Sequence, residues 1–117
     1  MEGLDLSDVF SNIPGHIYGK DLNGVYLFSN NSSVSKGELV GKTDEDCPWK
    51  EQAPQLREND KKVMDTRQSL SFVEKAFLAE NQLAYFYTVK SPLFDKKGKL
   101  IGIIGNSLNI TSLISEP

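Results

Sequence analysis

Runs of β-branched, aromatic and other apolar residues, bounded by polar turns, predict five β-strands. Two strands lie within residues 16–30, and the other three are 69–79, 84–94 and 99–110. Asp21–Gly24 and Asp95–Gly98 share one turn pattern, because Asp favours the first position of a turn and Gly supplies the positive φ near its end. A polar tip, Glu80–Gln82, joins the third strand to the fourth, so we expect Ala76 to lie roughly opposite Phe86. The pattern therefore predicts a hairpin, a gap and a three-strand meander.

Helical spacing of apolar residues predicts one short helix at the N-terminus. Residues 4–13 carry an apolar stripe, and Pro14-Gly15 ends the pattern. The stripe consists of Leu6, Val9, Phe10 and Ile13. A helix of this length is marginal alone, so we expect the stripe to pack against the sheet or against a second copy of the chain.

A longer helix is predicted in the gap between the two groups of strands. From Gln55, the apolar residues Leu56 and Val63 indicate an amphipathic helix that ends near Thr66. We expect Asp60 and Asp65 on its outward side. Before it only short helical pieces fit, one of them begun by Thr43 and Asp46, which have the spacing of a helix N-cap.

These elements define an α+β fold class. An antiparallel sheet that buries one face needs a cover, and the central helices are the available cover. We therefore predict a five-stranded antiparallel sheet in the order ββ–helices–βββ, with helices on one face, which together form a cup.

Composition narrows the classes of function. The 117 residues predict one domain, and the net charge of −3 lacks the basic excess of a nucleic-acid-binding module, so we expect no nucleic-acid partner. One Cys and one His exclude a disulfide and a Cys–His or zinc site, and we predict no enzyme. Without an apolar run of about 20 residues or a signal peptide, we expect a cytoplasmic protein that does not insert into membranes.

The order of elements, with several short motifs, resembles the PAS domain, a sensory module of signalling proteins. The motifs are Pro14 with Tyr18, Lys20-Asp21-x-x-Gly24, Gly41-Lys42-Thr43-Asp44, Asp60 with Val63, Lys90-x-Pro92-Leu93-x-Asp95-x-x-Gly98, Gly102 with Gly105, and Asn109-Ile110-Thr111. We divide the chain into an N-terminal amphipathic helix (1–14), a PAS sensor domain (15–113) and an exit tail (114–117).

The resemblance implies a non-catalytic domain that binds a small molecule in the cup. It would relay its state to a C-terminal effector, such as a histidine kinase of a two-component system, through Asn109, Ile110 and Thr111. The family usually has Asp at the first of these positions, so Asn109 removes a charge. The resemblance also favours a homodimer through the N-terminal stripe. The alternative is an interaction module whose core is filled by side chains and holds no ligand.

Nine residues are expected to bind the ligand or line the cup. They are Trp49, Met64, Phe72, Glu74, Phe86, Thr88, Lys90, Ile103 and Ser107. Alternation puts Glu74, Thr88 and Lys90 on one face of the sheet, and the resemblance implies that this face looks into the cup, so the charge of Lys90 needs a partner there. We predict an ion pair with Glu74, poised to meet a polar or anionic ligand group. The alternative is a bulge that turns Lys90 to solvent.

The resemblance argues against the family's flavin and haem groups, so no cofactor is expected. Asp44 stands where flavin-binding members have a reactive Cys, and Cys47 lies three residues later, as a structural or incidental thiol. The strand positions that would hold a flavin fall on Ala76, Phe86 and Ser107, and the first two cannot hydrogen-bond the ring. His16, the only histidine, is expected at the surface or a strand edge, far from the long helix.

Overall fold

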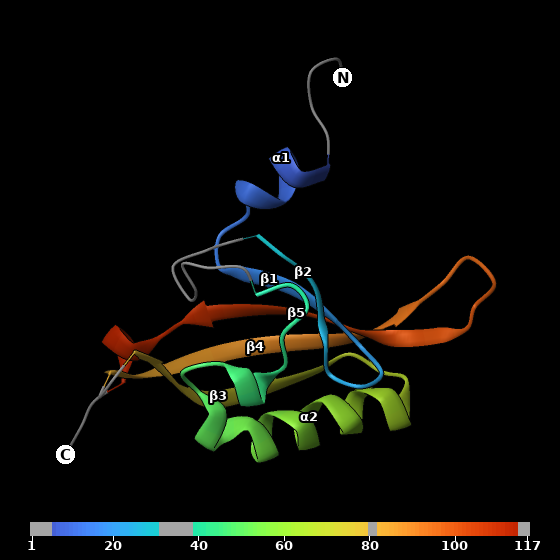
Figure 1. The fold of residues 1–117 in the computed structure, drawn as a ribbon. Coiled ribbons are helices and arrows are strands. Elements are labelled where there is room, and N and C mark those ends of the chain that lie inside the picture. The colour runs from blue at the N-terminus through green and yellow to red at the C-terminus, as the bar shows by residue number, and fades with distance from the viewer. Residues whose placement is uncertain (1–5, 31–38, 80–81, 115–117) are drawn as a thin grey trace.

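The structure, a computed structural model, describes residues 6–30, 39–79 and 82–114. In these ranges five strands form one antiparallel sheet with the spatial order β2-β1-β5-β4-β3 (Figure 1). The strands are β1 (His16–Asp21), β2 (Tyr26–Ser29), β3 (Leu70–Ala79), β4 (Gln82–Phe94) and β5 (Leu100–Asn109). The predicted fold class and order of elements are confirmed.

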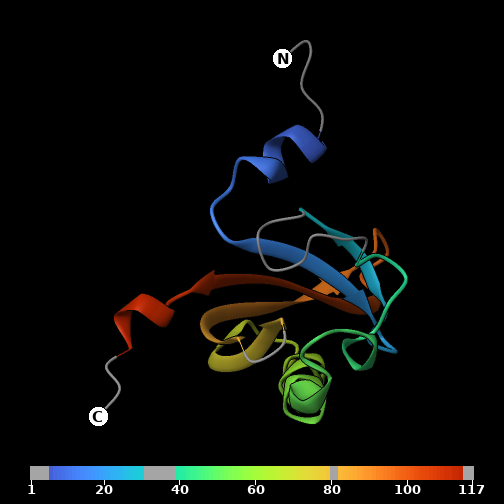
Figure 2. The same cartoon turned by 60° about the vertical axis from the view of Figure 1, so that its left-hand side comes forward.

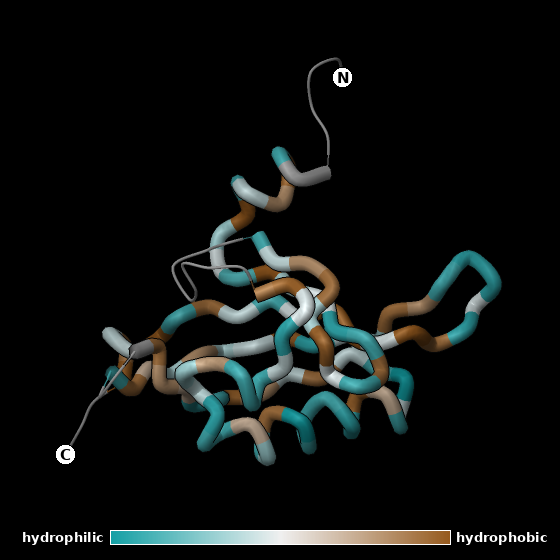
Figure 3. Tube along the Cα trace, in the orientation of Figure 1, coloured by the Kyte–Doolittle hydropathy of each residue, from teal (hydrophilic) through white to brown (hydrophobic). Residues whose placement is uncertain are grey.

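One helix, α2 (Ala53–Thr66), lies across one face of the sheet, and α1 (Leu6–Ser11) lies on the opposite side (Figures 1 and 2). Three short 3-10 helices complete the described elements: η1 (Asp44–Asp46), η2 (Lys50–Gln52) and η3 (Thr111–Leu113). The start of α2 precedes the predicted Gln55, because Pro54 occupies the first turn, where no backbone N–H is needed. Hydrophilic positions dominate the outward side of α2 (Figure 3).

The two Asp–Gly turns form as predicted. The Asp21 Oδ1 atom accepts hydrogen bonds from the backbone N–H groups of Asn23 and Val25 at 2.8 and 2.9 Å. Gly24 has a φ of 84°, in the left-handed region that glycine tolerates best. These turns fix the lengths of the paired strands.

The register between β3 and β4 differs from the expected one. We expected Ala76 to lie opposite Phe86, but the structure pairs Ala76 with Ala84 and Glu74 with Phe86. Pairing continues to Ala79 and Gln82, so the connection is tighter than predicted. A shift of two residues keeps each side chain on its predicted face of the sheet. Glu74 therefore points inward, as predicted, although the register differs by two residues.

The described part of the N-terminal helix ends at Ser11, before the predicted Ile13, and its stripe is only partly packed. Phe10 stacks on Phe28 of β2, with ring centroids 5.8 Å apart. Val9 is 40% exposed, Ile13 is half-buried, and the side chain of Leu6 lies outside the described part of the chain. The packing of α1 on its own sheet thus uses Phe10 and leaves Val9 accessible.

Candidate ligand-binding cavity

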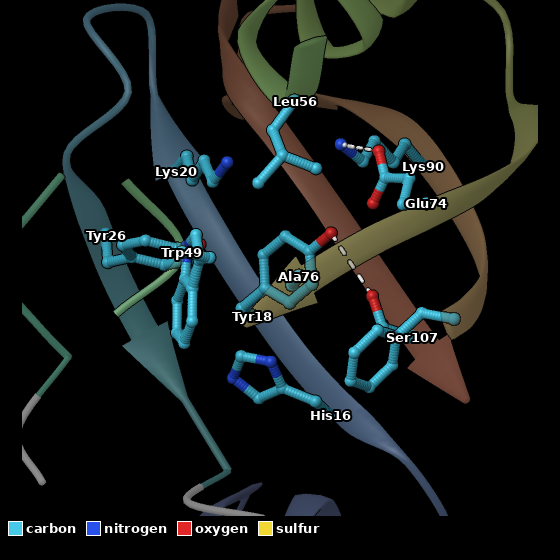
Figure 4. Close-up of a pocket in the computed structure, with 11 residues that line it drawn as sticks. His16, Tyr18, Lys20, Tyr26, Trp49, Leu56, Glu74, Ala76, Lys90 and Ser107 are labelled. Atoms are coloured by element: carbon cyan, nitrogen blue, oxygen red, sulfur yellow. Dashed lines mark hydrogen bonds and ion pairs between the residues drawn. The ribbon is translucent and has the colours of Figure 1, made fainter. Parts of the chain in front are cut away.

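A small cavity lies between the sheet and α2. Its volume is about 40 Å³, enough for about three water-sized groups. Apolar and polar side chains share its wall: His16, Tyr18, Lys20, Tyr26, Trp49, Leu56, Glu74, Ala76, Phe86, Lys90 and Ser107. Figure 4 shows these residues converging from all five strands and from the helical side. A concave, mostly apolar space with a few convergent polar groups is the usual form of a small-molecule site.

Five charged side chains form a continuous buried network at one end of this cavity. Asp60 of α2 lies at its centre and binds both lysines. The N···O distances are 2.7 Å for Lys20–Asp44, 2.9 Å for Lys20–Asp60, 2.7 Å for Lys90–Asp60 and 2.6 Å for Lys90–Glu74. All five side chains are at most 6% exposed. The predicted Glu74–Lys90 pair is confirmed, and it is one link of a longer chain of charges.

Strand alternation delivers the two lysines to the same place. Lys20 follows Tyr18 on the inward face of β1, and Lys90 follows Thr88 on the inward face of β4. Burial alone would lower the pKa of each ammonium, but the Asp60 carboxylate and a second acid beside each lysine outweigh it and raise the pKa. Both lysines are therefore held in the charged form.

At one end of the network, the Asp44 carboxylate accepts hydrogen bonds from several protein donors. Its Oδ1 atom accepts hydrogen bonds from the Tyr26 hydroxyl at 2.6 Å and the Trp49 indole N–H at 2.9 Å, and its Oδ2 atom accepts one from Lys20. Burial would raise the pKa of Asp44, but the Lys20 charge and these hydrogen bonds hold it below its ordinary value. This carboxylate is fully engaged by the protein.

Neutral polar groups occupy the other end of the cavity. The hydroxyls of Thr88 and Ser107 lie 2.9 Å apart. The Ser107 hydroxyl is also 3.5 Å from the Tyr18 hydroxyl (Figure 4). The His16 Nε2 atom is 2.8 Å from the Ser29 hydroxyl. Burial, assisted by the nearby Lys20 charge, lowers the pKa of His16 to about 4, so its ring is neutral at pH 7. The cavity thus has one charged and one uncharged polar end.

The structure sorts the nine residues expected at the cup. Trp49, Glu74, Phe86, Lys90 and Ser107 line the cavity. The other four are not on its wall: Ile103 and Thr88 are buried in the sheet, whereas Met64 and Phe72 pack against the edge of the core. The distinction depends on side-chain packing, because all four lie close to residues that do line the cavity. Ligand binding by the nine stays a prediction.

Sequence reasoning missed Lys20, Asp44 and Asp60 as parts of the site. The expectation that Asp60 faces outward is wrong, since it is only 2% exposed. The sequence could have predicted the burial of Asp60. It follows Leu56 by four residues and precedes Val63 by three, which places it on the same helix face as these two apolar residues. Along the sequence, Asp44 stands out only within a family motif and at the position of the reactive Cys, and no pattern distinguishes it as buried from the exposed Asp46.

The environments of His16 and Cys47 were also predicted from the sequence. The expectation that His16 lies at the surface or a strand edge is wrong, since β1 is an interior strand and His16 is 3% exposed. Cys47 is buried, and burial together with the Asp44 charge raises the pKa of its thiol to about 11. The thiol therefore has the unreactive character expected of a structural cysteine. The absence of flavin and haem stays a prediction.

The exit of the sheet is tied down without a charge. The Asn109 Oδ1 atom accepts hydrogen bonds from the backbone N–H and the hydroxyl of Thr111 at 2.9 and 2.6 Å. The Thr111 hydroxyl in turn accepts the backbone N–H of Tyr85 on β4 at 2.9 Å, and the N–H of Ile110 donates to the Tyr85 carbonyl at 2.8 Å. An amide oxygen at position 109 supplies these contacts in place of a carboxylate.

Comparison with known proteins agrees with this architecture. A family model described as the PAS fold matches residues 10–114. The chain belongs to the PAS family, and it is a PAS sensory domain. A protein named diguanylate cyclase from Vibrio cholerae serotype O1 is 31% identical over 113 residues, which cover 91% of this chain and 35% of that protein.

Two solved structures show the same fold. VqmA of Vibrio cholerae, in a complex with ligand and DNA, has a TM-score of 0.79 at 22% identity, covering 95% of this chain and 54% of that chain. The PAS domain of a Colwellia psychrerythraea protein has a TM-score of 0.76 at 10% identity, covering 91% of this chain and 94% of that chain. The chain thus spans about a third of the cyclase and about half of VqmA.

These comparisons correct the expectation about nucleic-acid partners. The exclusion of nucleic acid, drawn from the net charge of −3, is wrong, because VqmA shares this fold and is solved with DNA. The charge of a domain that matches only part of a protein does not decide what the whole protein binds. Among the described helices, none is long and apolar enough to cross a membrane.

Proposed function

We propose that this domain senses a small molecule that binds in the cavity between the sheet and α2. The observation that carries the proposal is the convergence of a buried ion network and a hydroxyl cluster on one cavity. A side-chain-filled core has no need for five buried charges, since apolar residues of similar volume are often neutral or stabilising in their place. Their presence is better explained by a polar ligand. The domain itself performs no chemistry in this proposal.

In this proposal, the signal that passes from the cavity to the effector begins at β5. Ser107 lines the cavity, and Asn109, two residues further along the same strand, holds Thr111 at the exit. A ligand that engages the Ser107 hydroxyl competes with Thr88 and Tyr18 for it, and so changes the contacts of β5 with β4 and β1. We propose that this change is passed to a C-terminal effector through residues 109–111.

The class of effector follows from the whole protein and not from this domain. The relatives named above include a diguanylate cyclase and a DNA-bound receptor, both longer than this chain. The histidine kinase expected from the sequence stays a prediction. A domain that only changes the geometry of its exit is compatible with each of these outputs.

Native mass spectrometry of gently purified protein tests the proposed ligand. We expect a retained small molecule, and we expect Ala76→Val to lose it, because the added methyl groups would occupy the cavity. Val73→Ile is the matched control: it enlarges a side chain on the same strand that is 64% exposed, and should retain the molecule. No retained mass, together with no thermal shift from any compound in a metabolite library, would favour the module without a ligand.

A second candidate function, self-association, is favoured by the outer face of the sheet. Tyr87, Val89 and Leu108 are each about two-fifths exposed there, in a groove beside Phe10 of α1. We propose that this face and the accessible Val9 form the contact between two copies. Deletion of residues 1–13, and Val9→Glu in the full chain, should shift the sedimentation profile toward monomer. An unchanged profile would remove the dimer from the proposal.

A further inference from the structure

The buried network carries one more negative charge than positive. Asp44, Asp60 and Glu74 supply three carboxylates against the two ammonium groups of Lys20 and Lys90, so its formal charge is 2 − 3 = −1. The remaining titratable groups on the cavity wall are His16, Tyr18 and Tyr26. At pH 7 all three are neutral: burial lowers the pKa of His16 and raises those of the two tyrosines. Among the described residues that line the cavity, no charged side chain outside the network offsets this excess negative charge.

The excess charge has one open acceptor. Five of the six carboxylate oxygens accept hydrogen bonds from the protein: both oxygens of Asp44, both of Asp60, and Oε2 of Glu74, which binds Lys90 and Asn59. Among the described residues, Glu74 Oε1 has no such partner. Figure 4 shows one Glu74 oxygen directed at Lys90 and the other directed into the cavity, on the side of the Tyr18 hydroxyl.

The two lysines, by contrast, have little left to offer an anion. Each ammonium binds two carboxylates. In addition, the Nζ atom of Lys20 lies 5.0 Å from the centre of the Tyr26 ring, and that of Lys90 lies 5.8 Å from the centre of the Phe72 ring. An anionic ligand would meet a net negative network whose cations are already paired, and its desolvation would not be repaid.

We propose that the cavity takes a small neutral or cationic molecule that donates an N–H or O–H hydrogen bond to Glu74 Oε1, and that it rejects carboxylates and phosphates. This inference rests on the proposed function and narrows its ligand class. It replaces the expectation that Lys90 meets a polar or anionic ligand group. Leu56, Ala76 and Phe86 line the space between the polar ends and suit the apolar body of such a molecule.

Three probes of one shape and different charge test the proposal: acetamidinium, acetamide and acetate. Each is titrated into ¹⁵N-labelled wild-type protein at pH 7, with amide shifts of the cavity strands as the signal. We expect acetamidinium to bind about tenfold or more tightly than acetate, the size of a hydrogen bond assisted by charge, with acetamide between them. Nuclear Overhauser contacts from the probe methyl group to Leu56 and Ala76 place it in the cavity.

Two variants assign the preference to Glu74. Glu74→Gln should abolish the difference between acetamidinium and acetate, whereas Glu58→Gln, which removes the same charge from an exposed position of α2, should leave it intact. If Glu74→Gln does not fold, the order of the probes on the wild-type chain decides alone. Acetate binding as tightly as acetamidinium overturns the inference and leaves the proposed function standing. No cavity shift with any probe also overturns the inference, and retained mass in the native spectrum then decides the proposed function separately.

Discussion

Asp60 on α2 accepts a hydrogen bond from Lys90 on β4 at 2.7 Å, and both side chains are at most 3% exposed. The other oxygen of Asp60 accepts one from Lys20 on β1 at 2.9 Å. One carboxylate therefore fastens the helix to two strands that are not neighbours in the sheet, since β5 lies between them. The cover and the sheet of the cup are held together by charge as well as by apolar packing.

Lys90→Met should lower the free energy of unfolding by about 3–5 kcal/mol, because it leaves Asp60 and Glu74 buried without their shared cation. Urea unfolding of the variant measures the loss. Lys61→Met is the control, since Lys61 pairs with Asp65 at 70% and 60% exposure, and its removal should change stability little. Equal, small effects of the two substitutions would mean that Lys90 is not held as described.

The double variant Lys90→Met/Glu74→Leu should recover much of the loss caused by Lys90→Met. It removes one charge of each sign, and so restores the network to a net −1, with Asp60 still bound to Lys20. A double-mutant cycle in urea gives the coupling between the two positions, which we expect to be a few kcal/mol. Additive effects would contradict a direct buried pair.

Stability should decrease between pH 7 and pH 5 because of His16. The unfolded chain binds a proton at His16 near its ordinary pKa of 6.5, whereas the folded chain does so only near 4. The unfolded state thus holds more protons in this window, so the free energy of unfolding decreases by about 2 kcal/mol as the pH is lowered from 7 to 5. His16→Gln should remove this part of the slope. The same slope in wild type and variant would show that His16 does not stay neutral in the folded protein.

The thiol of Cys47 should react slowly with a disulfide reagent such as DTNB in the folded protein. Burial raises its pKa to about 11, so little thiolate is present at pH 8, and the sulfur is also covered. The reaction should become fast in denaturant, and its absorbance trace is free of other thiols because the chain has one cysteine. A native rate close to the denatured one would show that Cys47 is accessible.

Gly105→Ala should disturb the cavity through Tyr18. A methyl group at position 105 of β5 would lie 2.4 Å from the Tyr18 ring, which crosses that glycine. The ring must move, and we expect a loss of about 1–3 kcal/mol in unfolding free energy, as for other overpacked cores. Near-ultraviolet circular dichroism should change with it. An unaltered spectrum and stability would show that the ring has room to spare.

Patterns local in the chain determined most of the fold. Alternation along the strands, the two Asp–Gly turns and the helical spacing after Gln55 each depend on neighbouring residues, so the order of elements and the shared face of Glu74 and Lys90 could be predicted. The register of β3 on β4 could not, because it depends on the length of the turn between them. An error of two residues there leaves the faces of both strands unchanged.

The sequence by itself determined that this chain is a PAS domain with a charged residue inside its cup, and that Lys90 needs Glu74. Only the tertiary structure decided that Asp60 joins Lys90 to Lys20, and that Asp44 closes the network. These partners lie 24 to 40 residues apart in the chain. No local period specifies such contacts, because they depend on how closely α2 and η1 approach the sheet. The same packing leaves Glu74 Oε1 open to the cavity, and it is this arrangement in space that defines the charge of the ligand.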